Sequence, residues 1–172
     1  EMGTSLEKEL PLIRIDPNYQ IKFDDGKVLT YRTDRKAMCK ELEEFEPGSS
    51  IRYEQYLRDA CKDYNVAWKH FINRNYDGPK DLLHPTVLMQ GMKMKAFGTL
   101  YNHISGVFKD KRLRQGFTFQ SMYLGTSPYT SPAIYGILPY TELVGGIYFP
   151  KGGMYAITKS LVRLAEQQNV KI

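Results

Sequence analysis

The segment that decides the fold reads Arg112-Leu-Arg-Gln-Gly-Phe-Thr-Phe-Gln-Ser-Met-Tyr-Leu-Gly-Thr-Ser-Pro-Tyr-Thr-Ser-Pro-Ala-Ile-Tyr135, and it is followed by Gly145-Gly-Ile-Tyr-Phe-Pro-Lys-Gly-Gly-Met154. Its residue order predicts a basic helix start, an aromatic run, a Ser/Pro break, an apolar helix, a short strand and a double-glycine turn into another helix. The first helix is predicted to run from Asp110 through Met122, and the apolar helix from Pro132 through Leu143.

A β-hairpin is predicted on the N-terminal side of this segment. Residues 19–23 and 27–31 read as strands, and Asp25-Gly26 between them supplies the positive φ values that a two-residue hairpin turn demands. Residues 10–15 read as a further strand. Strands and helices together indicate an α+β fold, with a small, mostly antiparallel sheet and several amphipathic helices on one side.

Helical spacing of apolar residues fills most of the region between the hairpin and the quoted segment. Asp34 is placed to cap a helix that stops at Pro47-Gly48. Apolar residues then recur three and four positions apart from Tyr53 to Ile72, which predicts a long amphipathic helix with Cys61 on its buried stripe. A second long helix is predicted from Val87 to Phe108.

Composition argues against several classes of protein. With 172 residues, 42% hydrophobic and 25% charged, the chain has ordinary globular composition and the length of one domain. The net charge is +5, but the basic residues are scattered among acidic ones rather than gathered in the patch that nucleic acid would require. No apolar run reaches about 18 residues, so no membrane-spanning helix is predicted.

The cysteines and histidines show no pattern typical of a metal site. Cys39 and Cys61 lack the paired spacing of zinc ligands and the density of a secreted disulfide scaffold. We expect both cysteines to be reduced and buried. The three histidines show no ligand spacing with each other or with a cysteine.

The quoted segments resemble the phytoene desaturase family, flavoproteins that remove hydrogens from long isoprenoid polyenes. The resemblance extends back through Leu42-Glu-Glu-Phe-Glu-Pro-Gly48 and Asp16-Pro-Asn-Tyr19 with its Asp24-Asp-Gly26 turn, and so covers nearly the whole chain. It implies the substrate-binding domain of an FAD-dependent carotenoid desaturase. The implied substrate is a C30 or C40 polyene drawn from a membrane, and the implied location is peripheral, on the cytoplasmic side of that membrane.

The fingerprint of flavin binding is missing from the chain. No Gly-x-Gly-x-x-Gly follows a strand, and this is the pattern that brings a backbone against the FAD pyrophosphate. Asn169-Val-Lys-Ile172 reads as a strand just beginning, where an independent domain seldom ends. We therefore expect residues 1–172 to be a single substrate-binding domain of a two-domain flavoprotein. FAD is expected only in the full-length protein, and the chain alone is expected to lack catalysis.

Asp81 and His84 are the candidate catalytic residues that the resemblance implies. Related enzymes carry an aspartate in the matching segment and an arginine three residues later, both assigned to the substrate cavity near the flavin. Asp81 matches this pattern and His84 departs from it, and histidine is not permanently charged as arginine is. The alternative is that Asp81 caps a short helix and His84 is a surface residue.

Gly152 and Gly153 stand at a predicted helix start, where free amides attract anions. Their spacing from Gly146 is not that of a P-loop, and Lys151 precedes the glycines instead of following them. A tight strand-to-helix turn is the alternative. The resemblance implies that this turn lies near the flavin but does not bind it.

Aromatic residues form the remaining candidate set. Tyrosine combines an apolar face with a polar tip, which suits core packing and also the wall of a long apolar cavity. The residues assigned to substrate binding are Phe117, Phe119, Met122, Tyr123 and Tyr148.

Two other functions remain open on the sequence. One is another flavin amine-oxidase-type enzyme, such as a retinoid saturase, although the run from Phe117 to Tyr123 favours the carotenoid branch. The other is a carrier of lipids or isoprenoids that performs no chemistry.

Overall fold

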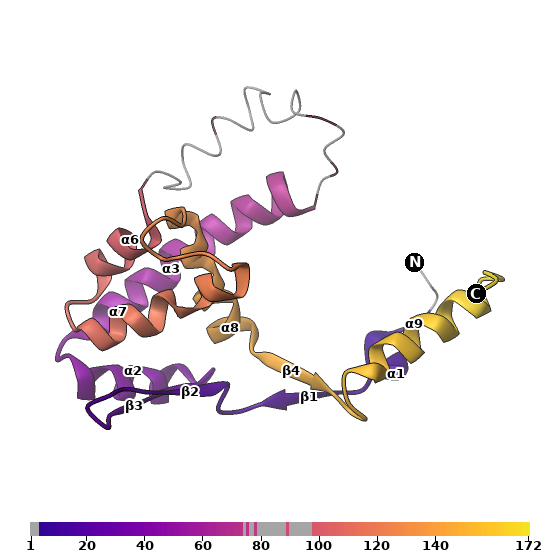
Figure 1. The fold of residues 1–172 in the computed structure, drawn as a ribbon, viewed down its shortest axis with the longest axis horizontal. Helices are drawn as coiled ribbons and strands as arrows, with labels where there is room; N and C mark the ends of the chain where they lie inside the picture. Colours follow the sequence, from indigo (N-terminus) through magenta and orange to yellow (C-terminus); the bar gives the residue numbers. More distant parts are fainter. Residues whose placement is uncertain (1–3, 74, 76–77, 79–88, 90–97) are drawn as a thin grey trace.

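The computed structural model describes residues 4–73, 75, 78, 89 and 98–172. A helical lobe carries one β-hairpin, and a two-stranded ribbon leads from this lobe to helices α1 and α9 (Figure 1). The predicted α+β class is confirmed. The described strands form two separate antiparallel sheets, β1 with β4 in the ribbon and β2 with β3 in the lobe.

The β2–β3 hairpin forms where the sequence predicts it, but its turn is longer than the predicted two-residue turn: the Phe23 N–H donates to the Lys27 carbonyl across Asp24-Asp25-Gly26. β2 covers Tyr19–Lys22 and β3 covers Val28–Tyr31, in a register that pairs Tyr19 with Tyr31. Gly26 has a φ of +81°, the left-handed conformation that the turn needs. Most of β3 is buried against the helices, so the hairpin belongs to the core of the lobe.

Helices α2 (Arg35–Phe45) and α3 (Ser49–Ala67) follow the hairpin, close to where the sequence predicts them. The Asp34 carboxylate caps α2 by accepting a hydrogen bond from the Ala37 backbone N–H at 2.6 Å. Gly48, with a φ of +78°, provides the left-handed turn between the two helices.

The other described elements are α1 (Leu6–Glu9), β1 (Leu12–Ile15), the π-helical segment η1 (Trp68–Ile72), α6 (Leu100–Val107), α7 (Lys111–Thr118), the 3-10 helices η2 (Phe119–Leu124) and η3 (Ala133–Gly136), α8 (Ile137–Gly145), β4 (Ile147–Pro150) and α9 (Tyr155–Gln167). Asp110 caps α7, accepting a hydrogen bond from the Arg112 N–H at 2.7 Å. The predicted strand at 147–149 and the predicted helix after the double glycine are both confirmed.

Aromatic side chains fill the core of the lobe. The Phe117 ring has no exposed surface, and its centroid lies 4.5 Å from that of Phe108 and 5.5 Å from that of Tyr31. Tyr53 and Tyr56 meet it edge-on from α3, at 6.0 and 5.8 Å. The hairpin, α3 and α7 are therefore held by one cluster of rings. Further buried members are Leu29, Met38, Leu42, Leu57, Ala60, Leu100, Ile104, Leu113 and Leu143.

The prediction of a continuous helix from Val87 to Phe108 is wrong in its described part. Gly98 has a φ of +98°, which is not helical, and the Thr99 side chain caps α6 by accepting a hydrogen bond from the Asn102 N–H. Thr99 also forms a β-bridge with Pro132. Residues 87, 88 and 90–97 lie outside the described part of the chain.

The last apolar residues of the long amphipathic helix predicted from Tyr53 to Ile72 are less buried than predicted. The helix changes to π-helical geometry at Trp68, which turns the following side chains out of the α-helical stripe, and Trp68 and Ile72 are both half-exposed. Cys39 and Cys61 are free thiols, as predicted, but both are only partly buried.

Two other predicted elements differ in form. The helix from Asp110 to Met122 becomes a 3-10 helix at Phe119, and the helix expected from Pro132 begins as the 3-10 helix η3. The predicted strand at residues 169–172 is wrong, because Asn169 adopts a φ of +60° and residues 170–172 are not paired in a sheet.

The β1–β4 ribbon pairs Ile13 with Phe149 in an antiparallel register. At its far end α1 and α9 bury little apolar surface and are joined by polar contacts. Arg163 forms an ion pair with Glu9 at 2.5 Å, and the Ser160 hydroxyl donates to the Glu9 carbonyl at 2.9 Å. No described helix is both long and apolar enough to cross a membrane, and the described residues contain no cluster of three or more potential metal ligands.

Candidate functional site

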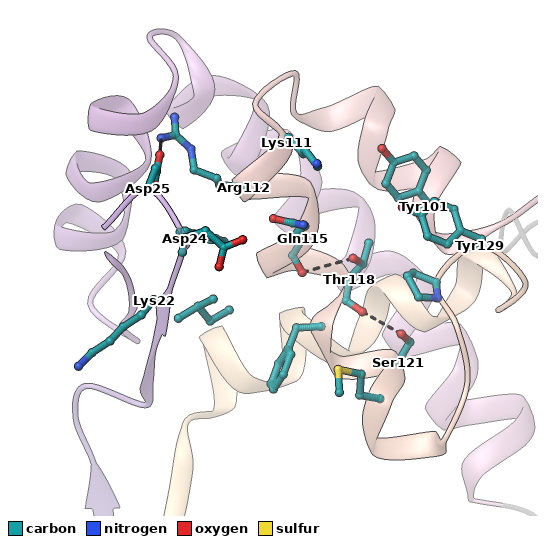
Figure 2. Close-up of a pocket in the computed structure, with 15 residues that line it drawn as sticks. Lys22, Asp24, Asp25, Tyr101, Lys111, Arg112, Gln115, Thr118, Ser121 and Tyr129 are labelled. Carbon is teal, nitrogen blue, oxygen red and sulfur yellow. Dashed lines mark hydrogen bonds and ion pairs between the residues drawn. The ribbon is translucent and has the colours of Figure 1, made fainter. Parts of the chain in front are cut away.

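A hollow of the described structure lies between the β2–β3 hairpin and helix α7 (Figure 2). This hairpin groove has a volume of about 600 Å³, within the size range of ligand sites. Its lining residues are Ile21, Lys22, Phe23, Asp24, Asp25, Tyr101, Lys111, Arg112, Gln115, Thr118, Phe119, Ser121, Met122, Pro128 and Tyr129.

Most of the groove wall is apolar. The hairpin contributes Ile21 and Phe23, and the 3-10 helix η2 contributes Phe119 and Met122. At the other end lie Tyr101 and Tyr129 (Figure 2), whose ring centroids are 4.5 Å apart with the ring planes tilted by 39°. Apolar walls with a few polar groups are typical of sites that bind apolar ligands.

Charged residues gather at one end of the groove, around Arg112. Its guanidinium contacts Asp25 of the hairpin at 2.5 Å (Figure 2). It also contacts both carboxylate oxygens of Asp110, at 2.5 and 3.0 Å. Hydrogen bonding from Arg112 lowers the pKa of the Asp110 carboxyl below its usual value. The guanidinium also lies 5.1 Å from the centre of the Phe45 ring, a cation–π contact. Arg112 therefore fixes the hairpin turn against the start of α7.

Helix α7 packs closely on the hairpin because residue 116 is glycine. A Cβ atom at Gly116 would lie 2.7 Å from Leu29 Cδ2, and Leu29 is fully buried. A larger residue would have to move packed core atoms. This close contact sets the distance between the two walls of the groove.

Several known proteins that are similar to this chain are named as desaturases of phytoene or diapophytoene. No family model matches the chain. It is 46% identical to a zeta-carotene-forming phytoene desaturase of Myxococcus xanthus, over 99% of the chain and 33% of that protein. It is 36% identical to a phytoene desaturase of Cercospora nicotianae, over 99% of the chain and 28% of that protein. It is 32% identical to a 4,4'-diapophytoene desaturase (4,4'-diaponeurosporene-forming) of Staphylococcus haemolyticus, over 100% of the chain and 34% of that protein.

This chain is homologous to one region of the phytoene desaturases. The resemblance predicted from the quoted segments is confirmed over nearly the whole sequence. The chain spans about a third of the length of the curated relatives that it matches.

The five residues predicted to bind the substrate lie in different parts of the structure. Phe119 and Met122 line the hairpin groove. Tyr123 meets the Phe119 ring edge-on at 5.7 Å, next to the groove. Phe117 is fully buried in the aromatic core, and Tyr148 lies on β4 in the ribbon, so the structure does not bring these two residues into the groove. Their substrate-binding roles stay predictions.

Asp81 and His84, the candidate catalytic residues, lie outside the described residues. Their assignment to the substrate cavity, and the alternative that Asp81 caps a short helix, both stay predictions.

The double-glycine turn does not have the features of a flavin site. Gly152 and Gly153 have φ values of +93° and +87°, so each needs glycine for its backbone conformation. A Cβ atom added to either residue would meet nothing within 4 Å, so no narrow cradle is formed there by the described residues. The described residues of this turn therefore do not fit a pyrophosphate-binding site, and the placement of the glycines near a flavin stays a prediction.

Several groove residues were not singled out from the sequence. Ile21 and Phe23 appeared only as strand residues, and Tyr101 and Tyr129 come from segments far apart in the chain. Alternation along β2 places Ile21 and Phe23 on one face of the strand, which could have indicated a shared surface. The pairing of Tyr101 with Tyr129 depends on tertiary packing and has no local signal.

Two glycine-to-alanine variants test the close packing that shapes the groove. Gly116→Ala should lower the free energy of unfolding by about 1 kcal/mol or more, because the clash with Leu29 exceeds the gain in helix propensity. Gly106→Ala, in α6 with open space around the new Cβ, should raise it by about 0.5–1 kcal/mol. Denaturant unfolding measures both. Stabilisation by both variants would show that α7 does not approach the hairpin this closely.

Proposed function

We propose that this chain is the substrate-binding part of an FAD-dependent phytoene desaturase-like enzyme, which introduces double bonds into a long isoprenoid polyene of C30 or C40 length. The observation that carries this proposal is the match over at least 99% of the chain to proteins named as desaturases of phytoene or diapophytoene.

The hairpin groove is the proposed place for a segment of the polyene. Its walls offer Ile21, Phe23, Phe119 and Met122, whose apolar surfaces suit a hydrocarbon chain that forms no hydrogen bonds. The ion pair between Arg112 and Asp25 neutralises two of the charges at one end, and three other charged side chains also line the groove. Removing apolar surface from water is the main driving force available for such a ligand.

FAD belongs to the proposal through the resemblance alone. FAD would supply the oxidising chemistry, and residues outside the double-glycine turn would bind it, since the described residues of that turn do not fit the cofactor. The proposed contribution of the chain is to bind the polyene, to orient it and to exclude water from it.

Peripheral contact with the cytoplasmic face of a membrane is also proposed. Met122, Tyr123 and Leu124 are consecutive and each is at least half exposed, and Tyr129 is 62% exposed near them. Exposed apolar side chains beside a groove would let a membrane-dissolved substrate pass into the site with little contact with water.

The function is tested by expressing the complete reading frame that contains this chain in cells that accumulate phytoene. We expect coloured polyenes with additional conjugated double bonds, identified after pigment extraction. Unchanged phytoene with full-length, folded protein present would contradict the desaturase proposal. A carrier would yield this outcome together with bound phytoene, and saturation of retinoids would favour the saturase alternative.

Phe119→Ala tests the groove within that assay. Loss of the ring removes apolar contact of roughly 1.5–3 kcal/mol, so conversion of phytoene should fall by about tenfold or more. Ile51→Ala, which changes an exposed apolar side chain on α3 outside the groove, should leave conversion unchanged. Thermal unfolding of both variants serves as the control for folding. Wild-type conversion by Phe119→Ala would place the polyene elsewhere.

Flotation with liposomes tests the membrane contact. The double variant Met122→Asp with Leu124→Asp should lower the bound fraction of the full-length protein by about tenfold, because two apolar side chains lose their place in the lipid interface. Ile51→Asp is the matched control and should bind as the wild type does. Equal binding by the double variant and the wild type would show that η2 is not part of the membrane contact surface.

A further inference from the structure

Behind the groove wall lies a polar cluster centred on the carboxylate of Glu142 in α8. The Oε2 atom of Glu142 accepts two hydrogen bonds, one from the Tyr19 hydroxyl at 2.8 Å and one from the Gln120 side-chain amide at 3.0 Å. The same Gln120 amide donates to the Tyr19 oxygen at 2.7 Å, which closes a triangle of hydrogen bonds. Gln120 is 1% exposed, whereas Tyr19 and Glu142 are partly buried.

The network joins three separate elements of the lobe. Tyr19 begins β2, Gln120 lies in η2 and Glu142 lies near the end of α8. The Glu142 main-chain carbonyl also accepts a hydrogen bond from the Asn18 side-chain amide at 2.9 Å. Asn18 follows β1 and Glu142 precedes β4, so the network lies where both strands of the ribbon leave the lobe (Figure 1).

Two tyrosines of this region flank Phe119, which lines the groove. The Tyr19 ring centroid lies 6.0 Å from that of Phe119, and Tyr123 meets Phe119 edge-on at 5.7 Å. Partial burial and then the negative charge of Glu142 raise the pKa of the Tyr123 hydroxyl to about 12. Burial and the same charge raise the pKa of Tyr19 well above its ordinary value. Both hydroxyls therefore lie within the field of one carboxylate.

We infer that Glu142 is a positioning residue of the hairpin groove, which holds Tyr19 and η2 so that the Phe119 ring keeps its place in the groove wall. The expected effect of Glu142 on substrate binding rests on the proposed function. The position of the Glu142 carboxylate rests on the hydrogen-bond geometry alone. Partly buried charge-assisted hydrogen bonds suit this role because they are strong and directional.

Two substitutions separate the hydrogen bonds of Glu142 from its charge. Glu142→Gln keeps an oxygen that can accept from Tyr19 and Gln120 and removes the charge, whereas Glu142→Leu removes both. Glu41→Leu is the matched control. The Glu41 carboxylate accepts a hydrogen bond from the Thr30 N–H of the same hairpin at 2.8 Å, but from the side of α2.

The first measurement uses the full-length protein labelled with [ζ-13C]tyrosine, followed by NMR between about pH 9 and about pH 13. Glu142→Gln and Glu142→Leu should both lower the pKa of Tyr123 from about 12 toward its ordinary value, and Glu41→Leu should not change it. A Tyr123 pKa that is equal in all four proteins would overturn the inference, because the carboxylate would then not face this tyrosine.

The second measurement uses the full-length enzyme with phytoene in liposomes. Glu142→Leu should raise KM about fivefold or more with kcat within about twofold, because a displaced Phe119 weakens ground-state and transition-state binding alike. Glu142→Gln should restore KM to within about twofold of the wild type, and Glu41→Leu should leave it unchanged. A KM for Glu142→Leu equal to that of Glu41→Leu would overturn the positioning role. If the wild type does not convert phytoene at all, the proposed function fails and this role falls with it, while the NMR result still decides where the carboxylate lies.

Discussion

The packing of aromatic rings around Phe117 is the interaction on which the rest of the lobe depends. Its four aromatic neighbours come from β3, from α3 and from the linker between α6 and α7. Burial of one such ring contributes about 1.5–3 kcal/mol, and tilted or edge-on ring pairs add further attraction. The hairpin and α7, which form the two walls of the groove, are both anchored in this cluster. The apolar walls of the groove are therefore held in place by a rigid, packed core.

The ribbon end of the molecule is built differently. Tyr148, Phe149 and Met154 are at least 43% exposed, and α1 is joined to α9 by the contacts of Glu9 rather than by a core. A two-stranded ribbon is marginally stable by itself in water. On the proposed function, this surface faces the remainder of the enzyme. The network around Glu142 lies at the junction of the two parts and connects the strands of the ribbon to the wall of the groove.

Local signals in the sequence predicted the elements whose ends depend on single residues. Asp25-Gly26 gave the hairpin because a tight turn needs positive φ, and Asp34 gave the start of α2 because a carboxylate satisfies free helix amides. The break at Gly98 and the change to π-helical geometry at Trp68 were missed, since the apolar spacing continues through both. Packing between distant segments decides such features.

The site was less predictable than the fold. Phe119 and Met122 could be proposed from the aromatic run, but helical spacing alone could not separate them from Phe117, which the 3-10 turn at residue 119 leaves in the core. Tyr19, Gln120 and Glu142 are far apart in the chain, and only the tertiary structure brings them together. The functional expectation came from the resemblance to phytoene desaturases and owed little to periodicity or composition.

Photo-crosslinking tests the central claim, that the hairpin groove holds the polyene, most directly. A long isoprenoid carrying a photoreactive group would be bound to the full-length protein, irradiated, and its adducts located by peptide mass spectrometry, with excess phytoene as competitor. The account predicts adducts on residues 21–23 and 119–123 that phytoene suppresses. Adducts that phytoene suppresses only on the ribbon, at residues 147–153, would contradict it.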